Sequence, residues 1–375
     1  MGRAELGVFA TAVYNHGMKP LRFAIFGAGF WARVQLAAWR EVGGVKCVAI
    51  FNRSRGKAEA FARELGIPAV YDDAGKLLRE VEPDFVDNIT EVGGHKPLSL
   101  LCARHRIPCI CQKPMAASLT DARQMVAAFA KAKTPFFVHE NWRWQTPMRA
   151  LIDTLRLGVI GTPFRARLTF TSGFDVWENQ PALRELEQFI LMDIGTHVLD
   201  TARACFGEAS LLYCQLHRTL QPAVRGDNVA TLLLSMGKAR TSVVVELAYA
   251  RTPLERERFP QTLAFVEGPG GSIEVADDYW LRITTKRGTS SKRHAPPRFA
   301  WADPSYDLSQ SSMVPCHRNL LAALRGKSRG ETTGADNLKT LELVFGAYES
   351  ARRNAVVEFR ETRRTSPADH RPDRH

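Results

Sequence analysis

The sequence lacks an apolar stretch long enough to cross a membrane, because no run approaches the roughly 18–20 apolar residues that a membrane helix needs. Its first twenty residues also lack the continuous apolar stretch of a secretory signal. Hydrophobic residues make up 45% and charged residues 24% of the 375 residues, which excludes disordered, collagen-like and coiled-coil chains. We therefore expect a soluble, cytoplasmic protein, and at about 100–200 residues per domain we expect two domains.

Paired cysteine motifs are missing as well. The seven cysteines are odd in number and most lie inside apolar runs, as the free, buried thiols of cytosolic proteins do. Cys109 and Cys111 alternate on an expected strand, so both thiols face one side, but they lack the C-x-x-C spacing of zinc and redox motifs. We expect no metal site.

Acidic residues are the minority, with 39 against 51 basic residues and a net charge of +12. The surplus is dispersed along the chain, and dispersed charge without a recognisable binding module is weak evidence for a nucleic-acid partner. An inert basic surface and the attraction of phosphorylated or acidic small molecules both remain open. We expect no specific nucleic-acid partner and no membrane partner.

The first 140 residues alternate short apolar runs with helical segments. Leu21–Phe26 is an apolar run apart from Arg22 and is followed by Gly27, as a buried parallel strand would be. A series of such βαβ units predicts an α/β Rossmann domain with a parallel sheet. The expected strands are 21–26, 47–51, 69–71, 84–89, 108–111 and 136–139, with helices between them.

The pattern changes after residue 140. Residues 162–171 alternate apolar and polar side chains, which is typical of a half-buried antiparallel strand. We expect an α+β domain with an open, mainly antiparallel sheet backed by helices, and a long loop over 286–311. Its other expected elements are strands near 211–217, 229–235, 241–249, 262–267 and 272–276, and helices at 147–157, 193–206, 312–325 and 336–351.

These patterns predict the domain organisation. The Rossmann domain is expected over 20–140 and the α+β domain over 141–359. Residues 1–19 are expected to form a disordered or extra N-terminal arm. Residues 360–375 are rich in arginine and have no apolar periodicity, so we expect a disordered tail.

A glycine motif lies between the first expected strand and the first helix. It matches G-x-G-x-x-G/A, in which the glycines allow a tight turn and a close approach of the backbone to a pyrophosphate, and the helix N-terminus stabilises the phosphates. The alternative is a glycine-rich turn in an α/β fold that binds no dinucleotide. The motif and its expected cofactor contacts comprise Gly27, Ala28, Gly29, Phe30 and Trp31, followed by Ala32.

An acidic residue is absent at the end of the second strand, where it would hold the 2′-hydroxyl of NAD. The segment reads Asn52, Arg53 and Ser54 instead, and an arginine there can pair with the 2′-phosphate of NADP. We therefore expect an NAD(P) cofactor, with NADP slightly favoured by Asn52 and Arg53 and NAD not excluded. Solvated residues at a helix start are the alternative interpretation of this segment.

Asp193 and His197 are four residues apart, so they share a face of the expected helix if it begins at or before Asp193. A carboxylate beside an imidazole sets its tautomer and raises its basicity, which suits proton removal from an alcohol. Taken alone, the same residues also fit a helix with a structural histidine, or a metal site that includes Asp200.

Four motifs together resemble one family. They are the glycine motif, Thr90 with His95 five residues on, Gln112-Lys113-Pro114 after the fifth strand, and the segment Asp193–Asp200. In order and placement they are similar to those of the glucose–fructose oxidoreductase/inositol dehydrogenase (Gfo/Idh/MocA) family, over roughly residues 20–358. The resemblance implies a Rossmann domain, an open-sheet domain that forms oligomer contacts, and NAD(P)-dependent oxidation of sugars, inositols and related polyols.

The resemblance also implies roles for single residues. Lys113 would bind the reacting hydroxyl, and with Asp193 and His197 it would form the catalytic set, leaving Asp200 structural. Thr90, His95, Gln112 and Lys113 would contact the cofactor. The sequence departs from the family pattern at Gln112, where glutamate is usual, at Glu91, where proline is usual, and at the bulky residues 189–192.

Expected substrate contacts come from two further blocks, beside Lys113, Asp193 and His197. Trp142 and Arg143 belong to the block 139–145, and Asp175 to the block 172–177, whose aromatic and polar side chains suit a sugar. A tryptophan-rich interdomain hinge is the alternative. Both blocks are similar to those of the D-apiose dehydrogenase subgroup, which argues for NAD and against our interpretation of Arg53.

We therefore expect a dehydrogenase that moves hydride between a sugar or polyol hydroxyl and nicotinamide, giving a lactone if the carbon is anomeric. A non-catalytic NAD(P)-binding sensor is the alternative. The partners expected are a small sugar or polyol and further copies of the chain, as a homodimer or homotetramer built on an uncovered face of the second sheet.

Overall fold

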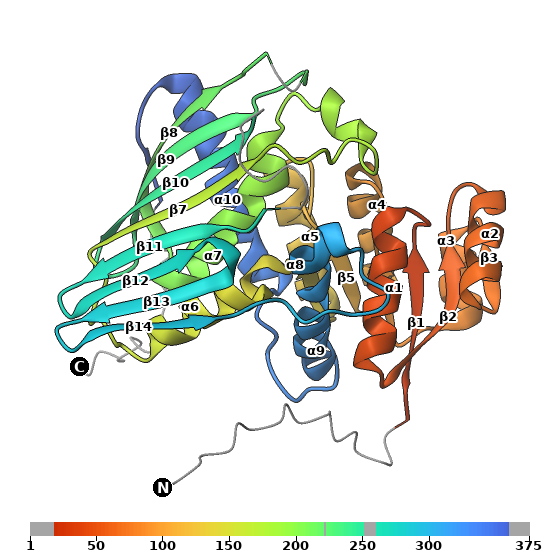
Figure 1. Ribbon diagram of the computed structural model, residues 1–375. Coiled ribbons are helices and arrows are strands. Elements are labelled where there is room, and N and C mark those ends of the chain that lie inside the picture. Colours follow the sequence, from red (N-terminus) through yellow and green to blue (C-terminus); the bar gives the residue numbers. More distant parts are fainter. Residues whose placement is uncertain (1–18, 221–222, 251–259, 360–375) are drawn as a thin grey trace, which may run out of the picture. The chain divides into compact units, whose positions relative to one another are not determined.

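The computed structural model describes residues 19–220, 223–250 and 260–359 (Figure 1). They divide into two compact units. The first unit contains the described residues through His139 together with Phe299–Ala302 and Met313–Asp336. The second contains Glu140–Arg298, Asp303–Ser312 and the described residues from Asn337 onward. The expected tail at 360–375, and all of the expected arm at 1–19 except Lys19, lie outside the described residues.

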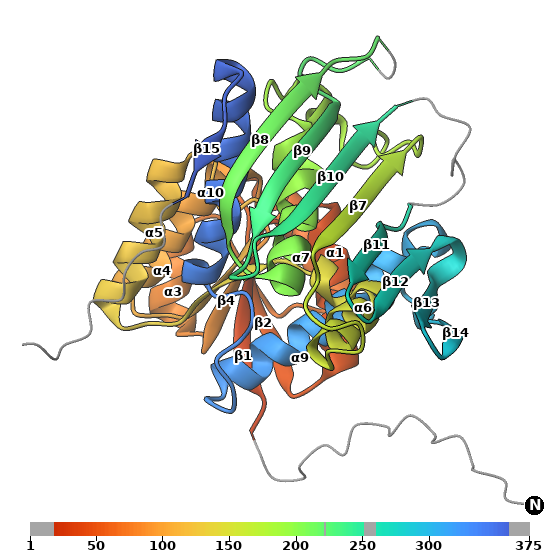
Figure 2. The ribbon, with the colours of Figure 1, turned by 90° about the vertical axis from the view of Figure 1, so that its left-hand side faces the viewer.

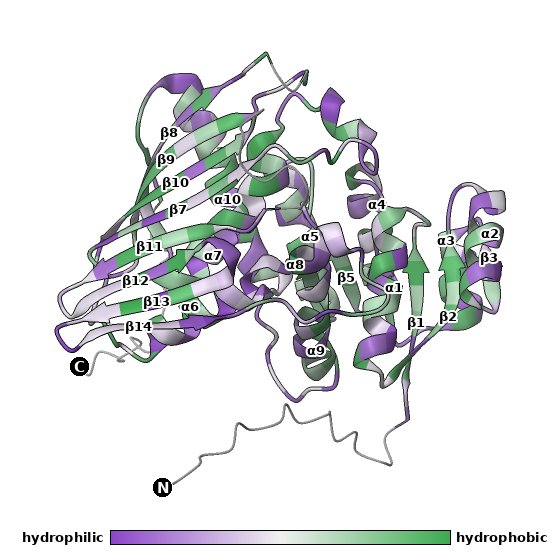
Figure 3. Ribbon diagram, viewed as in Figure 1, coloured by the Kyte–Doolittle hydropathy of each residue, from purple (hydrophilic) through white to green (hydrophobic). Residues whose placement is uncertain are grey.

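The first unit is built on a six-stranded parallel sheet in the order β3-β2-β1-β4-β5-β6. Strands β1 and β2 are mostly apolar (Figure 3), with Arg22 and Lys46 near their starts, because helices cover both faces of a parallel sheet. The predicted Rossmann fold is confirmed. The strands are β1 (Leu21–Phe26), β2 (Val45–Phe51), β3 (Ala69–Tyr71), β4 (Phe85–Asn88), β5 (Cys109–Gln112) and β6 (Phe136–His139).

Two helices of this unit, α3 and α5, begin at residues whose side chains cap them. Asp73 accepts a hydrogen bond from the backbone N–H of Lys76 (2.8 Å), and Ser118 accepts one from that of Asp121 (3.1 Å). The helices are α1 (Phe30–Val42), α2 (Arg55–Leu65), α3 (Ala74–Val81), α4 (Val92–Arg104) and α5 (Leu119–Ala132).

Helix α9 (Met313–Leu324) belongs to the first unit, whereas the sequence-based division placed it in the second domain. The reason is a contact with α1: the imidazole of His317 stacks on the indole of Trp39, with ring centroids 3.9 Å apart. Nearby, Nη2 of Arg325 donates to the carbonyl of Gly44 (2.8 Å). Residues 313–336 therefore belong to the first unit, although most of the second unit precedes them in the sequence.

The second unit is built on a nine-stranded sheet in the order β14-β13-β12-β11-β7-β10-β9-β8-β15. Neighbours are antiparallel except β7 and β10, which run parallel, so the predicted mainly antiparallel sheet is confirmed. The strands are β7 (Arg165–Ser172), β8 (Ala209–His217), β9 (Val229–Met236), β10 (Thr241–Tyr249), β11 (Leu263–Gly268), β12 (Gly271–Ala276), β13 (Trp280–Thr285), β14 (Gly288–Arg293) and β15 (Val357–Glu358).

Helices cover one face of this sheet. Figure 1 shows α6 (Thr146–Arg156), α7 (Thr196–Phe206) and α10 (Gly334–Arg353) on that side. Side chains alternate along β10, and those facing the helices, such as Val243, Val245 and Leu247, are buried in the core of the unit. Among the described residues no helix crosses the opposite face, which is turned toward the viewer in Figure 2.

The loop predicted over 286–311 is wrong in two places. Strand β14 forms a hairpin with β13, and a short helix, α8 (Asp307–Ser311), follows. Every residue of β14 is exposed, so the strand has no apolar alternation by which the sequence would reveal it.

Candidate active site

The glycine motif forms a tight turn between β1 and α1. Gly27 has φ +105°, and a Cβ atom there would lie 2.7 Å from the carbonyl oxygen of Ile89. Its N–H donates to the carbonyl of Phe51 (2.8 Å). Only glycine fits this position without strain.

Gly29 leaves an open cradle at the start of α1. A Cβ atom at Gly29 would meet nothing within 4 Å, and no side chain caps this end of the 13-residue helix. The positive end of this helix, with first backbone N–H groups that have no partner inside the helix, suits an anion. The turn therefore fits the pyrophosphate of a dinucleotide.

The segment after β2 lies at the same carboxyl edge of the sheet. The side-chain amide of Asn52 donates to the carbonyl of Ser54 (3.0 Å), which holds the turn. Ser54 is the N-cap of α2, but its hydroxyl makes no capping hydrogen bond. Arg55 pairs with Glu59 (2.9 Å), whereas Arg53 is exposed and forms no ion pair within the described residues. Among the described residues, Arg53 is thus the cation of this turn with no ion pair.

His95 connects two turns at this edge of the sheet. Its ring is 1% exposed; Nε2 lies 2.9 Å from the carbonyl oxygen of Thr90 and Nδ1 lies 2.8 Å from that of Pro114. Burial lowers the pKa of this imidazole, and the backbone hydrogen bonds oppose that shift. The expected cofactor residue His95 thus holds the turn after β4 against the loop after β5.

Lys113 follows β5, where open α/β sheets bind ligands. Its backbone N–H donates to Oε1 of Gln112 (2.6 Å), and the Lys113–Pro114 peptide bond is cis. The uncharged amide oxygen of Gln112 thus accepts a hydrogen bond from the adjacent backbone. The sheet edge brings together the expected cofactor residues from Gly27 to Lys113.

His197 lies at the start of α7 in the second unit. A π-helical turn, Leu191–Gly195, precedes α7 and contains Asp193. The imidazole is 4% exposed, and its Nδ1 hydrogen-bonds to a carboxylate oxygen of Glu140, which is fully buried. The indole of Trp142 stacks on the same ring, with centroids 4.4 Å apart and parallel planes.

Asp193 has a different partner. Its Oδ2 accepts a hydrogen bond from the hydroxyl of Tyr249 (3.4 Å), the last residue of β10. Burial raises the pKa of Tyr249 well above its usual value, and the nearby Asp193 raises it further. The phenol therefore stays protonated and can donate to the carboxylate.

Asp200 is occupied by a buried ion pair. The guanidinium of Arg143 binds its two oxygens at 2.7 and 2.6 Å, and the hydroxyl of Thr340 donates to it (3.1 Å). This network gives Asp200 the structural role expected of it. Two of the expected substrate contacts, Arg143 and Trp142, thus make buried contacts inside the unit. Arg143 binds Asp200, and Trp142 stacks on His197.

Asp175 is the exposed member of the expected substrate set. Its Oδ1 accepts from the backbone N–H of Trp177 (2.9 Å), and the indole of Trp177 packs on Phe189 (centroids 5.5 Å apart). Phe189 is one of the bulky residues that depart from the family pattern.

Sequence reasoning missed Glu140 and Tyr249. Glu140 follows β6 in a block already singled out, but nothing local shows that its carboxylate meets a histidine 57 residues later. For Tyr249, the sequence pattern predicts only that the side chain faces inward from a strand.

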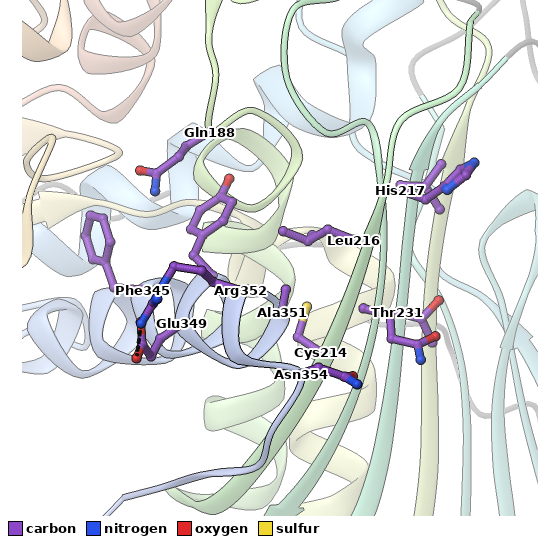
Figure 4. A pocket seen from close by; sticks show the side chains of 13 residues that line it. Gln188, Cys214, Leu216, His217, Thr231, Phe345, Glu349, Ala351, Arg352 and Asn354 are labelled. Carbon is purple, nitrogen blue, oxygen red and sulfur yellow. Dashed lines mark hydrogen bonds and ion pairs between the residues drawn. The ribbon is translucent and has the colours of Figure 1, made fainter.

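One hollow in the second unit lies away from these residues. It measures about 1030 Å³ and lies between β8 and α10, where Gln188, Leu216 and Phe345 line it (Figure 4). It contains none of the expected site residues, and its charged pair, Glu349 and Arg352, is joined by a hydrogen bond. We therefore assign it no part in the chemistry.

Two findings bear on the class of protein. Among the described residues, no group of three or more His, Cys, Asp or Glu side chains is arranged to hold a metal ion. In the same residues, no helix has the length and apolarity needed to span a membrane.

Two family descriptions match the chain. Residues 21–140 match the oxidoreductase family with an NAD-binding Rossmann fold, and residues 148–273 match the Gfo/Idh/MocA C-terminal domain. The chain belongs to the Gfo/Idh/MocA oxidoreductase family. The family resemblance seen in the sequence is thereby confirmed, and the first unit is an NAD-binding domain.

Several relatives cover nearly the whole chain. It is 41% identical to D-apiose dehydrogenase of Paraburkholderia graminis, covering 94% of this chain and 93% of that protein. It is 39% identical to D-apiose dehydrogenase of Rhizobium rhizogenes, covering 91% and 98% respectively. A solved oxidoreductase from Agrobacterium radiobacter, in complex with NAD+, L-tartaric acid and magnesium, is 38% identical with a TM-score of 0.87, covering 90% of this chain and 98% of that one.

Proposed function

We propose that the protein is an NAD(P)-dependent dehydrogenase of a small sugar, with D-apiose or a closely related aldose as its substrate. The observation that carries the proposal is the buried imidazole of His197, hydrogen-bonded at Nδ1 and stacked by Trp142. An imidazole held in this way is suited to act as a base near neutral pH. The 41% identity to a D-apiose dehydrogenase favours this class of substrate.

In this proposal Lys113 and His197 act on the same hydroxyl. The ammonium of Lys113 binds the hydroxyl oxygen and stabilises negative charge as it develops there. His197 accepts the proton as the C–H bond gives up hydride. The bound dinucleotide supplies the hydride acceptor at C4 of its nicotinamide. If the carbon is anomeric, the product is a lactone.

The first unit holds the cofactor in this proposal. The helix start at Gly29, Phe30 and Trp31 binds the pyrophosphate, and Asn52 to Ser54 bind the ribose that carries adenine. Thr90 and Gln112 lie on the nicotinamide side. Arg53 and Ser54 favour NADP, whereas the NAD+ complex of the 38% identical oxidoreductase favours NAD.

The remaining contacts concern the substrate and the assembly. Asp193 and Asp175 bind substrate hydroxyls, and Trp142 and Arg143 shape the site from beneath. The seven free thiols suit the reducing cytoplasm. We infer a homodimer or homotetramer built on the open face of the second sheet.

One screen tests the proposal. Purified protein is incubated with D-apiose, other aldoses, inositols, sugar acids and L-tartrate, each with NAD and with NADP, and formation of reduced nicotinamide is followed by absorbance. We expect turnover of a small aldose. A protein that binds dinucleotide tightly but reduces none with any compound would instead be the non-catalytic sensor.

Variants then test the assigned roles. His197→Ala should lower kcat by about 10²–10⁴-fold at neutral pH and leave dinucleotide affinity unchanged. Lys113→Ala should lower kcat and also weaken substrate binding. The effects in the double variant should fall short of the product of the single effects, because both residues act on one hydroxyl. Normal turnover by His197→Ala would disprove the assignment of the base.

A further inference from the structure

We propose that Glu140, and not Asp193, is the carboxylate that positions His197 and stabilises its protonated form. This inference rests on the proposed function, in which His197 is the base. It makes Glu140 a positioning residue, because it acts through the imidazole and not on the substrate itself.

The first support is the contact at the ring. Oε1 of Glu140 hydrogen-bonds to Nδ1 of His197, and the carboxylate is fully buried. A carboxylate oxygen accepts hydrogen bonds, so Nδ1 carries the proton in this contact. The lone pair of the neutral ring is then on Nε2, the atom that can receive a proton from a hydroxyl.

The second support is the short segment that holds both groups. The backbone N–H of Trp142 donates to the same Oε1 of Glu140 (3.3 Å), while its indole lies parallel to the imidazole. One turn of chain therefore positions the carboxylate at the edge of the ring and covers the face of the ring. Such double restraint limits rotation of His197 about both of its side-chain torsions.

The third support is that the competing carboxylates have other partners. Asp200 is one turn along α7, but the guanidinium of Arg143 neutralises it and occupies both of its oxygens. Oδ2 of Asp193 accepts from Tyr249. The hydrogen bond at Nδ1 of His197 joins it to Oε1 of Glu140.

The proton balance follows from this arrangement. As the substrate O–H bond breaks, a new N–H bond forms at Nε2, and the C–H electron pair leaves as hydride to the nicotinamide. His197 becomes an imidazolium with N–H groups at both nitrogens. Glu140 stays ionised throughout and stabilises that cation by charge and hydrogen bonding.

Other charged groups near α7 also affect the pKa of His197 and therefore the pH profile. The elements that pack against α7 are the segment Trp142–Trp144, the π-helical turn, α6, β7 and β10. Besides His197, those elements and α7 itself carry these charged or titratable groups: Arg143, Arg149, Asp153, Arg156, Arg165, Arg167, Asp193, Asp200, Arg203, Cys205, Glu246 and Tyr249. None of them is changed in the variant that tests Glu140.

The first experiment needs no substrate. Histidine is labelled with ¹⁵N, and the signal of His197 is assigned by its loss in His197→Ala. In the wild-type protein at pH 7 we expect the tautomer protonated at Nδ1. In Glu140→Gln we expect the pKa of His197 to fall by about one unit or more, because a stabilising negative charge is removed. An Nε2-protonated wild-type ring, or an unchanged pKa in Glu140→Gln, would overturn the proposal.

The second experiment is kinetic. Glu140→Gln should lower kcat at least tenfold, move the acid limb of the kcat profile to lower pH and leave KM for the dinucleotide unchanged. Asp193→Asn is the matched control, and the acid limb of its kcat profile should move less. If Asp193→Asn moved the limb and Glu140→Gln did not, Asp193 would be the positioning residue. Loss of activity in His197→Ala together with an unmoved limb in Glu140→Gln would reject this inference and leave the proposed function intact.

Discussion

Trp142 lies flat against the imidazole of His197, with ring centroids 4.4 Å apart and an interplanar angle of 0°. The indole is 2% exposed and also packs on Phe170. The sequence suggested that this tryptophan stacks on a sugar. The contact with His197 instead makes it part of the support of the proposed base.

This contact yields a kinetic prediction. Trp142→Leu should lower kcat by about tenfold or more while KM for the sugar changes little. The substitution removes the indole that holds the imidazole of His197, the proposed base, in place. Trp142→Phe keeps an aromatic face and is the matched control, which should retain most of the activity. A variant whose KM rises at constant kcat would show that Trp142 binds substrate. Thermal unfolding checks both variants for loss of core packing.

Arg53 should decide between the two cofactors. We expect Arg53→Ala to weaken NADP binding by about 1–3 kcal/mol, because a charged hydrogen bond to the 2′-phosphate is lost, and to leave NAD binding unchanged. Arg55→Ala is the control, since Arg55 pairs with Glu59 and should affect both dinucleotides equally. Titration calorimetry measures the dissociation constants of NAD and NADP for each variant. An equal loss for NAD and NADP in Arg53→Ala would reject the assignment.

His95 should affect the reaction through Lys113. His95→Ala removes the ring that joins Thr90 to the carbonyl of Pro114, so the loop after β5 loses its anchor. We expect a loss of about 1–3 kcal/mol in the free energy of unfolding. We also expect a fall in kcat, measured in the same preparation. His105→Ala, at the end of the same helix, is the control. Unchanged stability and kcat in His95→Ala would contradict this role.

Asp87 should make stability depend on pH. It is fully buried, it accepts a hydrogen bond from the indole N–H of Trp39 (2.8 Å), and burial raises its pKa to about 7. Because the folded pKa lies above the unfolded value of about 3.8, the folded state binds this proton more tightly. The contribution is fully present below about pH 4 and is lost as the pH rises to about 7, a difference of about 4 kcal/mol.

The isosteric variant isolates this effect. Asp87→Asn cannot ionise and its amide oxygen can still accept from Trp39. We expect its melting temperature to exceed that of the wild-type protein at pH 8.5 and to approach it at pH 5.5. Cys102→Ser, elsewhere in the same core, is a control that should shift the melting temperature equally at both pH values. A constant difference between Asp87→Asn and the wild-type protein across this range would mean that Asp87 titrates elsewhere.

The open face of the second sheet should carry the assembly. Leu233 and Phe265 are 50% and 42% exposed, and they lie in one row across the sheet, joined through Val244 and Arg167. We expect a dimer or tetramer by sedimentation at micromolar concentration, and monomers in the double variant Leu233→Glu, Phe265→Glu. Leu157→Glu is the control, because Leu157 is 80% exposed outside the sheet. A monomeric wild-type protein would contradict the inference.

Local patterns in the sequence were sufficient for most of the architecture. Strands 21–26, 69–71 and 136–139 were predicted to the residue, because short, mostly apolar runs between turn residues have few other structures open to them. The glycine turn was equally clear, since Gly27 needs both a positive φ and a close approach of Ile89. The family also followed from short motifs, and the matches over 21–140 and 148–273 confirm it.

Other features were decided only by contacts between distant segments. The place of α9 depends on His317 meeting Trp39, and β14 exists because β13 offers it a hydrogen-bonding edge and not because its own side chains are buried. The partner of His197 is the clearest example. By spacing along the helix, Asp193 was the expected carboxylate, but Nδ1 bonds to Glu140, which is 57 residues away in the chain and a neighbour only in the folded unit. Helical periodicity predicts which residues share a face, whereas tertiary packing alone determines what lies opposite that face.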